Sequence, residues 1–154
     1  MKETLQKYEE SLYYELEMSA KYIKRMGQNY FNSLDLDISP EEYIALDIIN
    51  EEPEICQRDL AKLMLKDRAG TGRVLQSLEL KGYIERYTDM KGNRIVRKMN
   101  LTQDGEQILL SIKEKLLPMT ERIQNQISYE EYSEFKRILK KIRTIVAENI
   151  KTNI

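Results

Sequence analysis

The chain has 154 residues, enough for one domain with a substantial core and too few to make two ordinary domains expected. It has no histidine and one cysteine, so the usual zinc and copper sites lack ligands, an internal disulfide is excluded and no histidine can act as a general base. We therefore expect no metal, no cofactor and no enzymatic activity. The formal net charge of −1 does not by itself indicate a polyanion partner.

The N-terminal part of the chain carries an amphipathic pattern. Apolar and small residues recur at spacings of three and four, on one helical stripe: Leu5, Tyr8, Leu12, Leu16, Ser19, Ile23, Met26 and Tyr30. This stripe predicts a single long amphipathic helix.

Three shorter helices are predicted next. Ser39-Pro40-Glu41-Glu42 is typical of a capping box with proline at the first helical position. The helix that it opens is broken at Glu52-Pro53. A third helix is expected from Cys56 to Met64, with Leu60, Ala61, Leu63 and Met64 facing inward. A fourth is expected from an Asp67 N-cap to a stop at Gly82, with Val74, Leu75 and Leu78 facing inward.

After Gly82 the apolar period changes from helical to about two. The segments 83–87 and 94–99 are rich in β-branched and aromatic residues, and they flank Lys91-Gly92-Asn93, where Gly and Asn tolerate the positive φ of a tight turn. We expect a β-hairpin with a basic tip.

Two amphipathic helices are predicted at the C-terminal end. Thr102 is a candidate cap for the first, whose apolar face contains Ile108, Leu109, Ile112, Leu116 and Leu117 and which Pro118 would kink or interrupt. Ser128 and Glu131 form a second capping box, which opens a helix with one apolar side: Tyr132, Phe135, Ile138, Leu139, Ile142, Ile145 and Val146.

The net charge hides a strong asymmetry along the chain. Residues 57–98 contain eleven Lys and Arg against five Asp and Glu, a local charge of +6, while the rest of the chain carries −7. A basic middle between acidic ends indicates a polyanion site, although a merely lysine-rich surface would have the same charge.

The order of these elements is typical of a winged helix-turn-helix, and the sequence resembles the MarR family over nearly its whole length. The resemblance is carried by Ser39-Pro40, by Leu60-Ala61, by the segment Leu78-Glu79-Leu80-Lys81-Gly82-Tyr83-Ile84-Glu85-Arg86 and by Leu101-Thr102-Gln103-Asp104-Gly105. It implies a mainly α fold with a small β-hairpin wing. In that arrangement residues 1–154 form one domain, with dimerisation helices at about 1–35 and 103–154 and a DNA-binding lobe at about 36–102.

The fourth helix is the candidate recognition helix. The major groove of DNA admits an α-helix, so its exposed side needs cationic or amide donors and small residues. The expected contacts are Arg68, Ala69, Gly70, Thr71, Gly72, Arg73 and Gln76 on the helix, with Lys91, Asn93 and Arg94 on the wing. The helical glycines would permit close approach to DNA, or else mark a frayed first turn that becomes ordered on binding.

Two features of the wing depend on the resemblance. Arg94 matches the arginine that family members place in the minor groove. Gly92 stands where the family has an aspartate that contacts the arginine equivalent to Arg86, and Asp89 is the candidate substitute. Leu65 also departs from the pattern, because many helix-turn-helix proteins have glycine at that turn position.

The resemblance further implies a homodimer that reads a pseudo-palindromic operator. The expected interface residues are Leu5, Leu12, Leu16, Ile142, Ile145 and Val146, although these stripes could instead pack within one chain. Family members often bind a small aromatic or phenolic effector, for which Tyr13, Tyr14, Tyr22 and Tyr30 are candidate contacts.

The function implied is that of a cytoplasmic, ligand-responsive transcriptional repressor that binds double-stranded DNA, with no membrane segment. Two alternatives stay open: a winged-helix module that binds another protein, and a redox-sensing regulator that uses Cys56. Cys56 is equally compatible with a plain structural thiol at the start of its helix.

Overall fold

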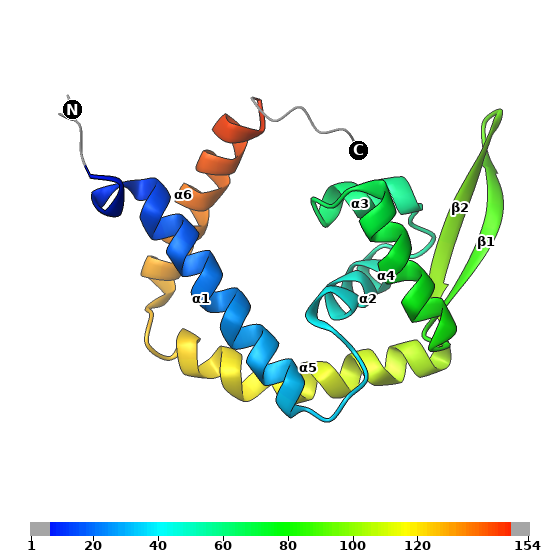
Figure 1. Cartoon of the computed structure of the whole chain (residues 1–154), viewed down its shortest axis with the longest axis horizontal. Helices are drawn as coiled ribbons and strands as arrows, with labels where there is room; N and C mark the ends of the chain where they lie inside the picture. Colours follow the sequence, from blue (N-terminus) through cyan, green and yellow to red (C-terminus); the bar gives the residue numbers. More distant parts are fainter. Residues whose placement is uncertain (1–6, 149–154) are drawn as a thin grey trace. The chain divides into compact units, whose positions relative to one another are not determined.

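The computed structural model describes residues 7–148, which contain six α-helices, one short 3-10 helix and one β-hairpin (Figure 1). These residues fall into two compact units, one ending at Glu42 and the other beginning at Tyr43. Within residues 7–148, no helix combines the length and the apolar character needed to cross a bilayer.

The first unit begins with the 3-10 helix η1 (Tyr8–Glu10), followed by α1 (Leu12–Ser33). Ser11 separates the two: its backbone is extended, and its hydroxyl oxygen accepts a bond from the Tyr14 N–H at 3.2 Å and donates to the Tyr8 carbonyl at 2.6 Å. A serine that bonds its own backbone favours a cap over a helix interior. The prediction of one helix running through Tyr8 is therefore wrong.

Helix α2 (Pro40–Glu51) starts at the predicted capping box. The Ser39 hydroxyl accepts from the Glu42 N–H at 3.2 Å, and the Glu42 carboxylate accepts from the Ser39 N–H at 2.7 Å. This reciprocal pair satisfies two backbone donors, one of them among the otherwise unpaired N–H groups of the first turn.

Helices α3 (Gln57–Leu63) and α4 (Arg68–Leu80) form the helix-turn-helix. The N–H groups of Leu65 and Lys66 bond back to the carbonyls of Lys62 and Ala61, at 3.1 and 2.9 Å, so α3 ends in a Schellman motif. Leu65 takes the left-handed position of this motif, with φ of 47°. Leu63 was expected to face inward but is 54% exposed, because the inward side of this short helix is occupied by Leu60 and Ala61.

Strands β1 (Ile84–Lys91) and β2 (Arg94–Leu101) pair in an antiparallel register that runs from Ile84 opposite Leu101 to Lys91 opposite Arg94. The hairpin turn therefore has two residues, Gly92 and Asn93. Gly92 has φ of 62°, which is the pattern of a type II′ turn. The hairpin is confirmed, and its first strand ends four residues later than the predicted segment, at Lys91.

The core of the second unit collects side chains from all of its elements up to α5 (Gln103–Gln124). The largest fully buried side chains are apolar apart from Thr71: Leu46, Ile49, Leu60, Leu75, Leu78, Met99 and Ile112. At the start of α5, Gly105 lies against the Tyr83 carbonyl, since a Cβ atom there would be 2.0 Å from that oxygen. This close approach fixes the first turn of α5 against the base of the hairpin.

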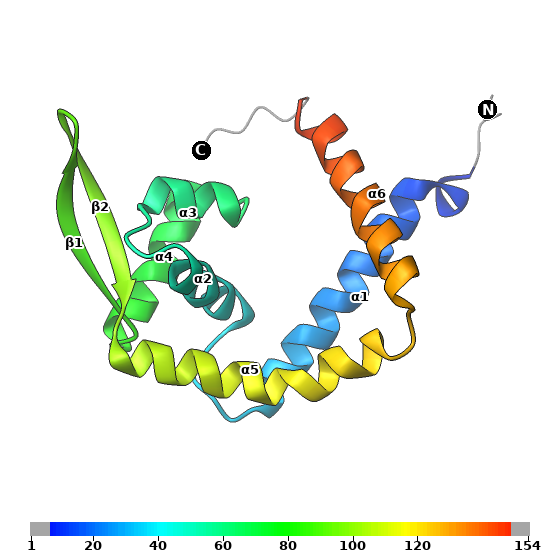
Figure 2. The same cartoon turned by 180° about the vertical axis from the view of Figure 1, so that it is seen from behind.

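Helix α5 leads from the base of the hairpin to α6 (Tyr129–Ala147) (Figure 2). It continues through Pro118 to Gln124, so the predicted interruption does not occur. Leu109, Ile112 and Leu116 are buried, whereas Leu117, expected on the same face, is 53% exposed. Helix α6 opens with the predicted Ser128–Glu131 capping box and contains no buried residue.

Candidate nucleic-acid interface

Helix α4 has two chemically distinct faces. Val74, Leu75 and Leu78 lie on its buried face, as predicted. The opposite face exposes Arg68, Ala69, Arg73 and Gln76, with Gly72 half-buried beside them. The Asp67 carboxylate caps the helix by accepting from the Gly70 N–H at 2.5 Å, as the sequence predicts. The exposed face therefore offers cationic and amide donors on a well-capped helix.

Thr71 and Gly70 do not belong to this exposed face. Thr71 is fully buried, and its hydroxyl donates to the Asp67 carbonyl at 2.8 Å. Gly70 is also buried, and a Cβ atom there would lie 2.8 Å from Lys66 Cε and 3.0 Å from Asp67 Oδ1. Gly70 thus makes room for the capping carboxylate. The expectation that Gly70 lies on the exposed side of the helix is wrong, and Thr71, an expected DNA contact, is also buried.

Gly72 has a different environment from Gly70. A Cβ atom at Gly72 would meet only Gln57 Nε2, at 3.4 Å, which is ordinary van der Waals contact. Packing inside the chain therefore does not require glycine at this position. Close approach by a partner remains a prediction for Gly72.

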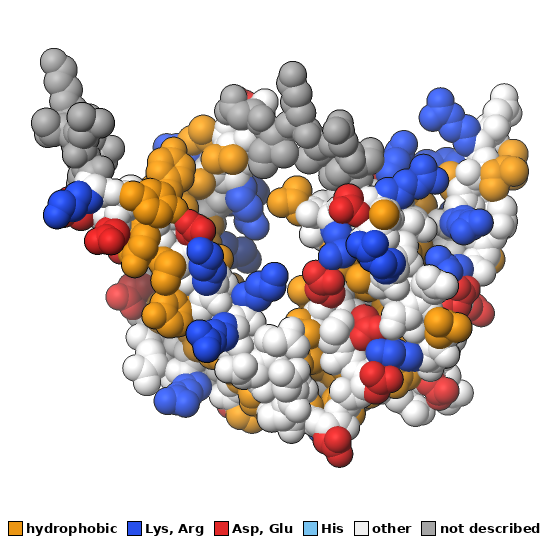
Figure 3. All heavy atoms as spheres, viewed as in Figure 1, with side chains coloured by type: hydrophobic (Ala, Val, Ile, Leu, Met, Phe, Trp, Pro, Cys, Tyr) orange, Lys and Arg blue, Asp and Glu red, His pale blue; other side chains and the backbone are white. Residues whose placement is uncertain are grey.

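The far end of the hairpin exposes Lys91, Asn93 and Arg94. Lys and Arg side chains gather over α3, the first half of α4 and the hairpin (Figure 3). Within residues 7–148, no salt bridge joins a carboxylate to Arg68, Arg73, Lys91 or Arg94. These four cations remain available to an external anion.

Glu79 of α4, and not Asp89, contacts Arg86. The Glu79 carboxylate accepts from both Nε, at 2.9 Å, and Nη2 of Arg86, and this bonding lowers the pKa of Glu79. Asp89 instead pairs across the hairpin with Lys98, whose Nζ is 2.6 Å away, and its pKa is lowered by that bond. The expectation that Asp89 contacts Arg86 is therefore wrong, and the wing is tied directly to α4.

A second set of bonds attaches the wing to the loop before α3. The Tyr87 hydroxyl donates to the Glu54 carboxylate at 3.0 Å, and the Glu54 N–H donates to Asn100 Oδ1 at 2.9 Å. Cys56 also forms an isolated antiparallel bridge with Lys98 of β2. The sequence analysis missed these bonds, because they join residues more than thirty positions apart and no local pattern marks them.

Cys56 is half-buried and occupies the N-cap position of α3. Its thiol donates to the Asp59 carboxylate at 3.1 Å, which lowers the pKa of Asp59. A hollow of about 290 Å³ between the 52–56 loop and the wing is bordered by Cys56, Pro53 and Val96, among others. The thiol has a clear structural role here, and redox sensing remains a prediction.

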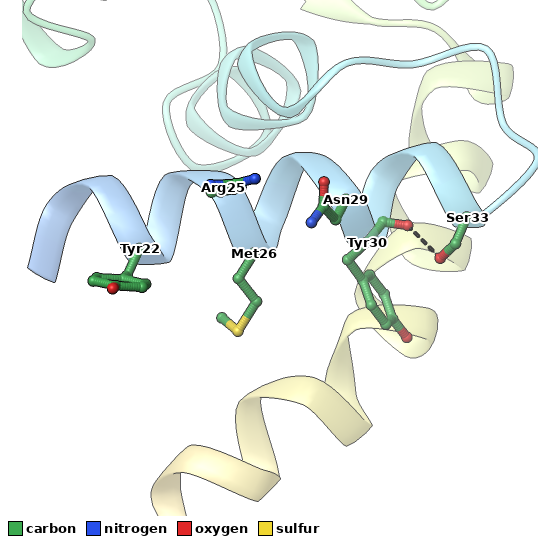
Figure 4. Close-up of a pocket in the computed structure, with 6 residues that line it drawn as sticks. All are labelled: Tyr22, Arg25, Met26, Asn29, Tyr30 and Ser33. Atoms are coloured by element: carbon green, nitrogen blue, oxygen red, sulfur yellow. Dashed lines mark hydrogen bonds between the residues drawn. The ribbon is translucent and has the colours of Figure 1, made fainter.

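The four candidate effector tyrosines do not line one pocket. Tyr22 and Tyr30 border a shallow depression of about 490 Å³ on α1, together with Arg25, Met26, Asn29 and Ser33 (Figure 4). Tyr13 is 72% exposed and lies outside it, and Tyr14 packs edge-to-face on Tyr8, with ring centroids 5.8 Å apart. A single pocket containing all four rings is not formed.

The candidate dimer residues are largely uncovered. Leu12, Ile145 and Val146 are 59%, 56% and 43% exposed, Leu16 and Ile142 are half-buried, and Leu5 lies outside the described residues. Helix α6 also exposes Tyr132, Phe135 and Ile138. The apolar side of α6 thus lacks a covering surface within the described part of its own unit.

Comparison with known proteins shows what the chain is similar to. Residues 36–95 match the model of the MarR family. The chain is 28% identical over 109 residues to the HTH-type transcriptional regulator YybA of Bacillus subtilis, covering 71% of this chain and 72% of YybA. It is 29% identical over 109 residues to the HTH-type transcriptional regulator BilQ of Clostridioides difficile, covering 69% and 73% of the two chains.

The fold is also found among solved structures. Staphylococcus aureus MepR, determined in complex with DNA, matches with a TM-score of 0.75 and 22% identity, over 88% of this chain and 98% of MepR. The family match lies on the helix-turn-helix and most of the wing, where the exposed cations described above are found. Residues 36–95 thus match the MarR family, and the chain is similar in sequence to HTH-type transcriptional regulators and in fold to the winged helix-turn-helix protein MepR.

Proposed function

We propose that this chain is a sequence-specific regulator that binds double-stranded DNA as a homodimer and represses transcription until a small aromatic or phenolic ligand binds. The observation that carries the proposal is the exposed face of α4, where Arg68 and Arg73 have no salt-bridge partner among residues 7–148. The unpaired wing cations Lys91 and Arg94 belong to the same compact unit.

Helix α4 is the proposed recognition helix. An arginine can donate two hydrogen bonds to guanine O6 and N7, and a glutamine can pair with adenine, each such pair contributing about 1–3 kcal/mol of discrimination. Arg68, Arg73 and Gln76 are the proposed base contacts, with Ala69 and Gly72 allowing close approach of the helix. Thr71 and Gly70 are left out because they are buried.

The wing is proposed to bind the adjacent minor groove through Arg94, with Lys91 and Asn93 contacting the backbone. Narrow A·T-rich grooves have an enhanced negative potential that attracts arginine. The Glu79–Arg86 pair supports this geometry, because it joins β1 to the helix that would occupy the major groove.

The homodimer is proposed to form through the apolar face of α6 and the apolar stripe of α1. Tyr132, Phe135, Leu139, Ile142 and Val146 follow alternating spacings of three and four, which is the seam of a helix-packing interface. Two-fold symmetry would place two recognition helices on half-sites about one DNA turn apart. The related MepR is found in complex with DNA.

Ligand response is proposed to begin at the depression on α1. The depression on α1 offers two tyrosine rings and Arg25, a set that suits an aromatic acid. Binding there would lower DNA affinity if it changed the spacing of the two recognition helices. We propose that such a regulator acts in the cytoplasm, and DNA binding of this kind needs no catalytic step.

Selection of bound duplexes from a random DNA pool tests the proposal. A two-fold symmetric motif, bound with an affinity that falls steeply as salt rises, is the expected result. Arg73→Ala should relax base preference at one position of each half-site, whereas Arg94→Ala should weaken binding across sequences. Arg122→Ala, on the exposed surface of α5, is the matched control.

Two outcomes would overturn the proposal. Failure of the pure protein to bind any duplex in a salt-dependent way would favour a winged-helix module that binds protein. Loss of binding after mild peroxide treatment in the parent chain, but not in Cys56→Ser, would instead favour the redox-sensing alternative over ligand response.

A further inference from the structure

Two large apolar side chains are exposed near the tip of the wing. Met90 of β1 is 58% exposed and Ile95 of β2 is 72% exposed. They are direct partners in the hairpin register, one pair before the turn-closing pair Lys91–Arg94. Directly opposed residues of an antiparallel pair project from the same face, so Met90 and Ile95 form one continuous apolar patch.

This patch continues a face that is buried at the base of the hairpin. Because side chains alternate along a strand, Ile84, Arg86, Thr88 and Met90 share one face with their partners on β2. Ile84 and Met99 on that face are 2% and 0% exposed. The face therefore changes from core to open surface toward the turn, and the apolar pair lies on the open part.

The surroundings of the patch are cationic. Arg97, the partner of Thr88, is exposed beside the patch on the same face, while Lys91 and Arg94, the next pair toward the turn, are exposed at the tip and project from the opposite face. Within the described range 7–148, none of these three cations forms a salt bridge. A complementary surface must therefore accept apolar contact at its centre and positive charge at its rim. The minor groove of DNA has this chemistry, with deoxyribose carbons in its walls and phosphates along its edges.

We propose that Met90 and Ile95 form an apolar wedge that packs against the deoxyribose walls of the minor groove beside Arg94. The inference rests on the proposed DNA-binding function and adds to it an interaction that is independent of charge. Isoleucine and methionine are among the apolar side chains that minor-groove proteins use as wedges, in those cases between base steps. Wing binding would then combine a salt-dependent part from Lys91 and Arg94 with a salt-independent part from the apolar pair.

The test compares salt titrations of DNA binding by full-length variants on the duplex selected by the parent chain. The double variant Met90→Thr/Ile95→Thr keeps side chains suited to a strand and removes most of the apolar surface. Its affinity should fall roughly tenfold, with the slope of log affinity against log salt unchanged. Lys91→Ala should instead lower the magnitude of that slope, by about one for each phosphate that is no longer bound.

Two controls separate the wedge from simpler explanations. Leu80 is the last residue of α4, at the end away from Arg68, and its apolar side chain is 82% exposed. Leu80→Gln removes this apolar surface and should not change DNA affinity. Met90→Leu/Ile95→Val, which keeps the apolar character, should retain nearly the parent affinity. Thermal unfolding of each variant reports whether the hairpin still folds.

The outcomes distinguish the wedge from the underlying function. If the parent chain binds no duplex, the proposed function fails. If the parent binds and the double threonine variant binds equally well, the wedge alone is wrong. A loss of affinity accompanied by a reduced salt slope also overturns the wedge, because the cations would then have been displaced with it. Unchanged DNA binding together with lost capture of a protein partner would assign the patch to that partner.

Discussion

Helices α4 and α6 begin with the same kind of N-terminal cap but differ in which face each one exposes. Both have a side-chain N-cap, Asp67 in one and Ser128 with Glu131 in the other. Helix α4 buries its apolar face in the core and exposes arginines, whereas α6 buries nothing and exposes its apolar face. The local caps therefore show where a helix begins. The chemistry of the exposed face indicates which kind of partner would bind there.

The contrast assigns different partners to the two regions. An exposed cationic face is well solvated in the free protein, and its interaction with an anion is favourable. An exposed apolar stripe is unfavourable in water, and the free energy of the protein falls when another apolar surface covers the stripe. We expect substitutions in α6 to change assembly, and substitutions in α4 and the wing to change affinity for DNA without changing assembly.

The largest expected effect comes from placing a charge on the apolar side of α6. Phe135→Asp should convert the proposed dimer into a monomer, and DNA affinity should then fall by roughly 100-fold because the two half-sites are no longer bound together. Light scattering at micromolar concentration and a DNA titration measure the two effects. Arg137→Asp, on the opposite side of α6, is the control, and a monomeric mass for the parent chain would refute the prediction.

A pair of glycine substitutions extends the comparison to backbone packing. Gly105→Ala should lower the free energy of unfolding by about 2–3 kcal/mol, because the new methyl group would collide with the Tyr83 carbonyl. Gly27→Ala, in α1, has nothing within 4 Å of the added Cβ and should raise it by up to about 1 kcal/mol. Denaturant unfolding measures both. Equal effects would mean that the approach of α5 to Tyr83 is not close in solution.

Smaller effects are expected at the Schellman motifs that end α3 and α4. The motif after α4 has the same pattern as that after α3: the N–H groups of Gly82 and Tyr83 bond to the carbonyls of Glu79 and Leu78. Leu65→Gly should stabilise the protein by about 1 kcal/mol, because Leu65 has a positive φ and its side chain is 71% exposed. Gly82→Ala, at the equivalent turn after α4, should destabilise it by a similar amount because Gly82 has φ of 75°. Thermal melts of both variants measure the contrast, and a destabilising Leu65→Gly would contradict it.

The smallest effect concerns the attachment of the wing to α4. The hydrogen bond from Arg86 lowers the pKa of Glu79 in the folded state. The pair therefore stabilises the folded state at pH values above the usual pKa of a carboxyl group. This stabilisation is lost as the pH falls through the lowered pKa. Glu79→Gln should therefore cost at most about 1 kcal/mol near neutral pH, since Glu79 is 41% exposed, and nothing in strong acid. Unfolding measured across pH tests this, and a constant difference would contradict it.

Much of the fold was predictable because its signals are local. The capping boxes at Ser39 and Ser128, the Asp67 cap and the hairpin turn at Gly92 each depend on hydrogen bonds or dihedral preferences within four residues. Local signals can also mislead, as at Ser11, where an apolar stripe predicts a continuous helix but the serine caps a new one.

The sequence by itself determined the order of elements, the charge concentrated in residues 57–98 and the apolar stripe of α6. Only the tertiary structure decided that Thr71 is buried beside exposed arginines, that Arg86 pairs with Glu79, and that Glu54 contacts Tyr87 and Asn100. The reason is physical. A helix cap depends on neighbours along the chain, whereas the partner of a side chain on a packed face depends on how separate elements are rotated and aligned against one another.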